Sequence, residues 1–146
     1  LSSGYSIPPE YVCDRDRYHE FMREQREYEA RKALYEMKRQ EYLKVKEKGN
    51  FVLLELTKKG RVEAIKQKVL GTKEFLPKDQ ACLISFDIPE NVKKTRNAFR
   101  SFIKKAGFKQ EHLSVWINRL NVVEGMRELV CELKIEKWVK IYKAEL

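Results

Sequence analysis

The stretch from Ala81 to Glu90 constrains the fold more than any other part of the sequence. It reads Ala-Cys-Leu-Ile-Ser-Phe-Asp-Ile-Pro-Glu, a short apolar run that ends in an aspartate and a proline. A run this short and this apolar predicts a strand that is buried on both faces. Pro89 cannot donate a ladder hydrogen bond but suits the first turn of a helix, so the strand must end near Asp87.

Asp87 is therefore the most site-like residue of the chain, because it is a carboxylate held at the exit of a buried strand. The sequence also allows a purely structural role. In that role the side chain of Asp87 would cap the next helix by accepting hydrogen bonds from the free backbone N–H groups there. Both interpretations stay open at the level of sequence.

The overall charge points to an anionic partner. The chain has 31 Lys and Arg residues against 22 Asp and Glu, a formal net charge of +9. Such an excess favours nucleic acid, and we predict double-stranded DNA. No apolar stretch is long enough to span a bilayer, so no membrane partner is expected. The three cysteines are widely spaced and odd in number, which indicates a reducing, cytoplasmic setting and no zinc site.

Residues 14–70 are predicted to form a first unit, after a lead-in at residues 1–13. Residues 14–40 contain no Gly or Pro. Within them, apolar side chains recur from Ala30 to Met37 at the spacing of a helix with one face on a core. The segment is either one long helix or two helices joined near Glu27.

A hairpin and a second helix complete this unit. Strands are expected at 43–46 and 51–56, on either side of a turn at Gly49. Thr57 is a good N-cap for the helix that follows. The order helix, hairpin, helix predicts the back half of a winged helix-turn-helix, and an unspecialised helix-hairpin-helix is the alternative.

Basic residues gather in the later part of the first unit. Residues 31–73 hold 13 Lys and Arg against five Asp and Glu, whereas residues 14–29 hold four against six. The excess lies on the helix end and the hairpin, where side chains of a winged helix meet DNA phosphates and base edges. The DNA-binding candidates here are Arg31, Lys32, Tyr35, Lys38, Arg39, Lys46 and Lys48.

A linker is expected at residues 71–80, and a second unit at residues 81–146. Its order of strand, helix, two strands, helix and strand predicts a ferredoxin-like βαββαβ domain, so the chain as a whole belongs to the α+β class. The expected elements are a strand at 82–87, a helix at 90–106, strands around 108–118, a helix at 121–136 and a strand at 138–144.

The first helix of this second unit has two different faces. Its buried stripe is predicted to consist of Val92, Phe99, Phe102, Ile103 and Ala106, and Gly107 should end the helix as a C-cap. The opposite face is basic, because residues 91–110 include seven Lys and Arg and no Asp or Glu. This face is either a solvated surface or a phosphate-binding one. Its DNA-binding candidates are Lys93, Arg96, Arg100 and Lys104.

Three short motifs of the second unit resemble a known family. The motifs are Phe86-Asp87-Ile88-Pro89-Glu90, Ala106-Gly107-Phe108 and Ser114-Val115-Trp116, and residues 139–146 are similar to the family's last strand. They resemble the Cas2-like central domain of the PaaX family of transcriptional repressors. Residues 33–38, the hairpin and residues 56–60 are similar to the winged-helix half of such repressors.

The resemblance implies a ferredoxin-like homodimer. In the related CRISPR adaptation proteins, the aspartate that ends the first strand binds a divalent metal near the dimer axis, and Asp87 matches that position. Mg²⁺ is the cofactor this would imply, although none is required for DNA binding. Glu90 is the nearest other carboxylate in sequence, so a metal site would need the Asp87 of a partner subunit.

Three functions follow from these observations. The first is a dimeric DNA-binding regulator of transcription without enzymatic activity. The second is a CRISPR adaptation subunit or a Mg²⁺-dependent endonuclease, in which Asp87 would be catalytic. The third is a structural or assembly subunit that binds a partner within a nucleoprotein complex through the helix at residues 14–40.

Overall fold

The structure is a computed structural model that describes residues 15–146. The chain divides into two compact units, one ending at Glu55 and one spanning Leu56–Leu146. The predicted lead-in at residues 1–13 lies outside the described residues.

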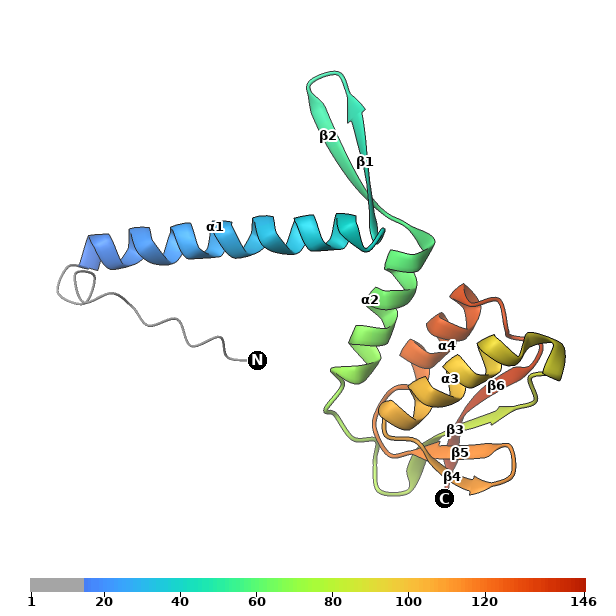
Figure 1. Cartoon of the computed structure of the whole chain (residues 1–146). Helices are drawn as coiled ribbons and strands as arrows, with labels where there is room; N and C mark the ends of the chain where they lie inside the picture. The colour runs from blue at the N-terminus through green and yellow to red at the C-terminus, as the bar shows by residue number, and fades with distance from the viewer. Residues whose placement is uncertain (1–14) are drawn as a thin grey trace. The chain divides into compact units, whose positions relative to one another are not determined.

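The first unit contains the predicted hairpin and, of the two alternatives for residues 14–40, the single long helix. Helix α1 spans Arg15–Arg39 without interruption, and strands β1 and β2 span Leu43–Lys48 and Phe51–Leu56 (Figure 1). The two strands form a two-stranded sheet. Gly49 adopts a φ of +57° in the turn. Glycine reaches this left-handed conformation with little conformational energy, because it has no Cβ atom.

The apolar side chains of α1 and β2 are not in a core. Leu34 is 39% exposed and Phe51 is 76% exposed, and every residue of β2 is exposed. The prediction that Ala30, Ala33 and Leu34 pack on a core is therefore wrong for the described residues. Helical spacing shows that one face of a helix is apolar. It does not show that another element of the same chain packs against this face.

The second unit has the predicted ferredoxin-like fold. Its sheet has the strand order β4-β5-β3-β6, and all the neighbouring pairs are antiparallel. Helices α3 and α4 lie on one side of this sheet (Figure 1). The elements are β3 (Gln80–Phe86), the 3-10 helix η2 (Glu90–Val92), α3 (Lys93–Lys105), β4 (Lys109–His112), β5 (Val115–Asn118), α4 (Val123–Glu132) and β6 (Val139–Glu145).

The core lies between the sheet and these two helices. Alternate residues of β3, namely Cys82, Ile84 and Phe86, are buried in it. Leu83 and Ser85 on the opposite face are only half-buried, so the prediction of a strand buried on both faces is wrong. The stripe of α3 meets them as predicted, since Phe99, Phe102, Ile103 and Ala106 are buried and Val92 is packed against the core. Burial raises the pKa of the Cys82 thiol to about 12.

Gly107 ends α3 as the sequence predicts. Its φ is +96°, in the left-handed region that favours glycine. The N–H of Phe108 donates to the carbonyl of Ile103 at 3.0 Å, which is the long hydrogen bond of a Schellman motif. The chain thus turns from α3 directly into β4.

Helix α2 (Lys58–Leu70) belongs to the second unit. Thr57 caps it as predicted, accepting a hydrogen bond from the N–H of Gly60 at 3.0 Å. Val69 is buried in the core, and Arg61 pairs with Glu132 of α4 at 3.2 Å. The boundary between units therefore precedes the linker expected at residues 71–80, because the apolar face of α2 packs against α4.

Two cysteines lie within the second unit. Cys82 is buried in β3, whereas Cys131 of α4 is exposed. Between residues 15 and 146, none of the helices combines the length and the apolar character needed to cross a membrane.

Candidate functional site

The end of β3 opens into a polar pocket of about 270 Å³. The pocket contains three of the residues that the sequence singled out, namely Asp87, Arg96 and Arg100. Two of them come from α3 and one from the segment that follows β3. The full lining is Phe86, Asp87, Ile88, Arg96, Arg100, Gln110, Leu113 and Ser114. The fold thus brings a carboxylate and two guanidinium groups to one place.

Asp87 is not a helix cap. Its backbone N–H donates to the carbonyl of Trp138 at 2.9 Å, which fixes the chain at the end of the sheet. Pro89 occupies the N-cap position of η2 and Val92 that of α3, and neither helix has a side-chain cap hydrogen bond. The capping interpretation is wrong because the helical segment begins beyond Pro89, so the capping position does not fall on Asp87.

Arg96 lies at the border between the apolar stripe and the basic face of α3. Its side chain is 21% exposed, and one terminal nitrogen (Nη1) donates to a carboxylate oxygen of Glu90 at 2.9 Å. The Nε atom is buried and has no hydrogen-bond partner within the described chain. An unpaired buried donor is costly, so this nitrogen marks a position where an acceptor would be favourable.

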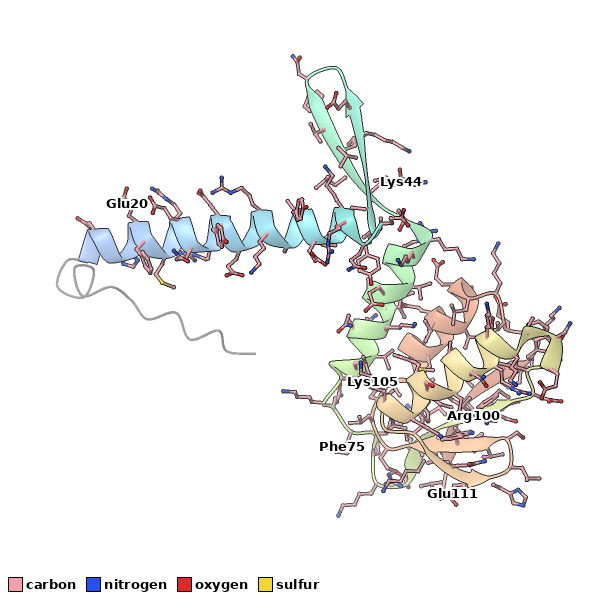
Figure 2. The ribbon with its side chains drawn as sticks, in the orientation of Figure 1. Glu20, Lys44, Phe75, Arg100, Lys105 and Glu111 are labelled. Carbon is pink, nitrogen blue, oxygen red and sulfur yellow. The ribbon has the colours of Figure 1, made fainter. Side chains whose placement is uncertain are left out.

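The basic face of α3 is open to solvent. Lys93, Arg100 and Lys104 are exposed on it, and Figure 2 labels Arg100 on α3. The Lys104 ammonium lies 5.9 Å from the centre of the Trp116 ring, a distance at which a cation is attracted by the ring. The predicted basic face therefore exists as a surface of the second unit.

The pocket of a single chain has too few oxygen ligands to hold a divalent metal ion. Residues 15–146 contain no group of three or more His, Cys, Asp and Glu side chains that could hold a metal ion. Mg²⁺ requires several oxygen ligands, whereas Asp87 shares the pocket with two cationic side chains. A single chain therefore supplies one carboxylate, Asp87, to this pocket.

The second unit matches one protein family. Residues 78–146 match the family described as the PaaX protein central Cas2-like domain. This region is a PaaX-type Cas2-like domain. It begins just before β3 and includes the whole four-stranded sheet, as the resemblance of residues 81–146 implied. No curated protein and no solved structure matches the chain.

The other candidate residues lie before the PaaX-type domain, in the first unit. Arg31, Lys32, Tyr35 and Lys38 are exposed on α1. Arg39 donates to Glu36 at 2.6 Å, and this hydrogen bond lowers the pKa of the Glu36 carboxyl.

Of the two candidate lysines of the hairpin, the structure describes the side chain of Lys46 only. The ammonium group of Lys46 lies 2.6 Å from a carboxylate oxygen of Glu55 on the neighbouring strand. The side chain of Lys48 lies outside the described residues. The hairpin candidates therefore remain predictions.

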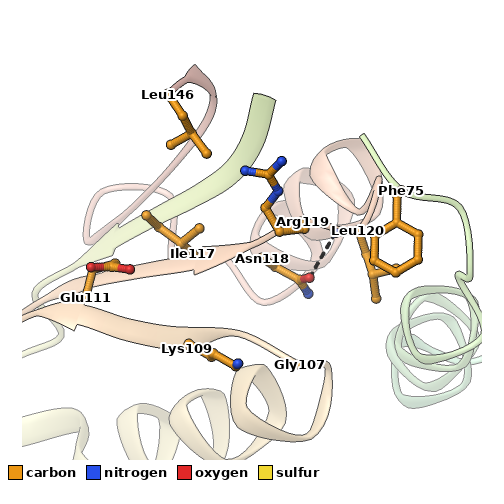
Figure 3. Close-up of a pocket in the computed structure, with 9 residues that line it drawn as sticks. All are labelled: Phe75, Gly107, Lys109, Glu111, Ile117, Asn118, Arg119, Leu120 and Leu146. Carbon is orange, nitrogen blue, oxygen red and sulfur yellow. Dashed lines mark hydrogen bonds between the residues drawn. The ribbon is translucent and has the colours of Figure 1, made fainter. Parts of the chain in front are cut away.

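The PaaX-type domain has a larger cavity that sequence reasoning missed. Its volume is about 490 Å³, and none of the predicted site residues lines it. Figure 3 shows the residues that line it, among them the buried Asn118, whose side-chain oxygen accepts a hydrogen bond from the N–H of Leu120 at 3.0 Å. The lining comes from separate segments with no common spacing, so no signal in the sequence could have revealed it.

Proposed function

We propose that this protein binds double-stranded DNA and dimerises through its PaaX-type domain. A transcription-regulator kind of function follows from that domain. The observation that carries DNA binding is the basic face of α3, since residues 91–110 include seven Lys and Arg and no acidic residue. A one-sided basic surface on a folded domain attracts the phosphates of a duplex.

The first unit supplies a second basic surface. The exposed candidates of α1 and the lysines of the hairpin would contact phosphates in the manner of a winged helix. Lys46 is already paired with Glu55 in the free protein. A phosphate that approaches Lys46 would therefore compete with this carboxylate. An exposed ion pair contributes little stabilising free energy, so the competition is weak.

The sheet offers a face for dimerisation on the side opposite α3 and α4. On this side Leu83 pairs with Ile117 and with Tyr142 in the antiparallel register. Leu83 and Ile117 are half-buried, and Tyr142 is 51% exposed. A two-fold axis that stacks two such faces would bury these side chains in a self-complementary interface.

Removing both hairpin lysines should weaken DNA binding without changing its sequence preference. In the double variant Lys46→Ala, Lys48→Ala we expect the slope of log affinity against log salt to fall by roughly two units, about one for each phosphate that the variant no longer neutralises. Fluorescence anisotropy with a labelled duplex, titrated over a range of salt concentrations, measures this slope.

The matched control for this experiment is the pair Lys73→Ala, Lys78→Ala. It removes the same charge from exposed positions that we do not assign to DNA. An equal decrease of slope in both double variants would show that only net charge matters. Absence of duplex binding by the unmodified protein at low salt would overturn the proposed function itself.

We further expect no cleavage of duplex DNA in the presence of Mg²⁺ or Mn²⁺. The reason is that Asp87 shares its pocket with Arg96 and Arg100 rather than with further carboxylates. The measurement is a nuclease assay on the unmodified protein and on Asp87→Asn together. Metal-dependent cutting by the first and not by the second would establish the endonuclease alternative.

A further inference from the structure

The pocket at the end of β3 contains hydrogen-bond donors from α3 and from the segment that precedes β5. Arg96 and Arg100 lie one turn apart on α3, and Ser114 precedes β5 on the opposite side. The carbonyl of Ser114 accepts a hydrogen bond from the N–H of Phe86 at 3.2 Å, which places this residue beside the end of β3. The pocket thus lies at the surface end of β3, and only Phe86 and Ile88 of its lining are buried.

Arg96 is held in position for a ligand. Its pairing with Glu90 at 2.9 Å fixes one arm of the guanidinium, and its buried Nε has no partner within the described residues. The planar guanidinium matches the oxygens of a phosphate or a carboxylate in two parallel hydrogen bonds. The exposed Arg100 adds a second positive charge to the same pocket. These features select an oxyanion.

The turn between β4 and β5 forms one wall of the pocket. The side-chain amide of Gln110 donates to the carbonyl of Leu113 at 2.5 Å, which ties the two ends of this turn together. Both residues line the pocket. The wall opposite α3 is therefore held by its own hydrogen bond and does not depend on a ligand for its shape.

Asp87 decides which oxyanion fits. An ionised carboxylate only accepts hydrogen bonds, so it repels an anion unless that anion carries a proton to donate. Phosphate monoesters keep such a proton on part of the molecules near neutral pH, since their second pKa is about 6, and inorganic phosphate keeps it on a larger part because its second pKa is higher. Sulfate, carboxylates and the phosphodiester of a DNA backbone have no such proton. The carboxylate therefore distinguishes a monoester from the DNA backbone.

We propose that the pocket formed by Asp87, Arg96, Arg100 and Ser114 binds a phosphate group that carries a proton, as inorganic phosphate or as the monoester end of a small phosphorylated molecule. The volume of about 270 Å³ is close to the lower end of the ~300–1,000 Å³ of ligand pockets. It therefore leaves room for a compact organic group beside the phosphate. Arg96 and Arg100 also belong to the basic face proposed to bind DNA, so this proposal assigns these two side chains to the pocket and leaves the DNA contacts of α3 to Lys93 and Lys104.

The test is isothermal titration calorimetry on the full chain with four probes at equal ionic strength. The probes are inorganic phosphate, methyl phosphate, dimethyl phosphate and sulfate. We expect inorganic phosphate and methyl phosphate to bind at least about tenfold more tightly than the other two, because only they satisfy Asp87 without repulsion. Equal affinity for all four probes, or no binding of phosphate, would overturn the proposal.

Two variants separate the roles of the pocket residues. Arg96→Gln should lower phosphate affinity about tenfold, because the oxyanion loses its charge-assisted hydrogen bonds. Asp87→Asn should let sulfate and dimethyl phosphate bind about as well as phosphate, because the carboxamide can donate to them. Lys104→Gln, on the same helix but outside the pocket, is the matched control and should leave all four affinities unchanged.

Circular dichroism and a thermal melt confirm that each variant is folded. If Arg96→Gln does not fold, the exposed Arg100→Gln serves in its place. A decrease of phosphate affinity in Lys104→Gln equal to that in Arg96→Gln would show general charge attraction and would refute the site.

One last experiment separates the two sources of phosphate. A DNA duplex without terminal phosphates that displaces methyl phosphate from the pocket would assign the pocket to the DNA backbone and refute the monoester. We expect no displacement. The calorimetric titrations contain no DNA, so failure of DNA binding leaves their result unaffected and the two proposals fail separately.

Discussion

Replacing Phe99 by alanine should lower the free energy of unfolding by about 3–5 kcal/mol. Phe99 is 2% exposed, and its ring meets that of Phe86 edge to face, with the ring centres 5.3 Å apart. The substitution removes most of a buried aromatic side chain and leaves a cavity between α3 and the sheet. It also removes an aromatic pair that is itself worth about 0.5–1.5 kcal/mol.

Urea unfolding followed by circular dichroism measures this decrease in stability. Phe75→Ala is the matched control, because it makes the same chemical change at a side chain that is 71% exposed. The control should change the free energy of unfolding by no more than about 0.5 kcal/mol. A decrease below about 1 kcal/mol in Phe99→Ala would contradict the placement of this face of α3.

Replacing Gly125 by alanine should destabilise the second unit by about 1–3 kcal/mol. A Cβ atom at this position would lie 2.8 Å from the Cγ2 atom of Val69, a separation that real Cβ atoms do not show. Val69 is 2% exposed and β-branched, so it has little freedom to move aside. Glycine at position 125 is therefore what allows α4 to approach α2 closely.

The effect of Val69 can be isolated by a second substitution. In a Val69→Ala background the obstructing methyl group is absent, so Gly125→Ala should be neutral or should stabilise the protein by up to about 1 kcal/mol, the gain of alanine over glycine inside a helix. Urea unfolding of the two single variants and the double variant gives the coupling between the sites. Equal destabilisation in both backgrounds would mean that the close approach of α2 and α4 is not the cause.

Local patterns in the sequence were enough to predict the secondary structure of the PaaX-type domain. The apolar run before Asp87, the stripe that contains Phe99 and the C-cap at Gly107 were all confirmed. Each depends on residues a few positions apart, whose spacing reports which side chains share a face. The ferredoxin-like order follows from these elements because few topologies accommodate them.

The composition of the candidate site was predicted only in part. Asp87, Arg96 and Arg100 were each selected from the sequence, but for different purposes. The sequence did not indicate that they line one pocket, nor that Ser114 and Gln110 complete it. The larger cavity near Asn118 was not predicted at all. Such sites depend on which loops meet in space, and local spacing carries no information about this.

The sequence by itself determined the elements of this protein, their order and the basic character of α3, because these depend on local periodicity and on residue type. Only the tertiary structure decided which faces acquire partners. The apolar face of α2 packs on α4, whereas the equally apolar β2 is exposed. The physical reason is that a side chain is buried only when a complementary surface, often distant in sequence, packs against it. A periodic pattern identifies the apolar face of one element but not the element that covers it.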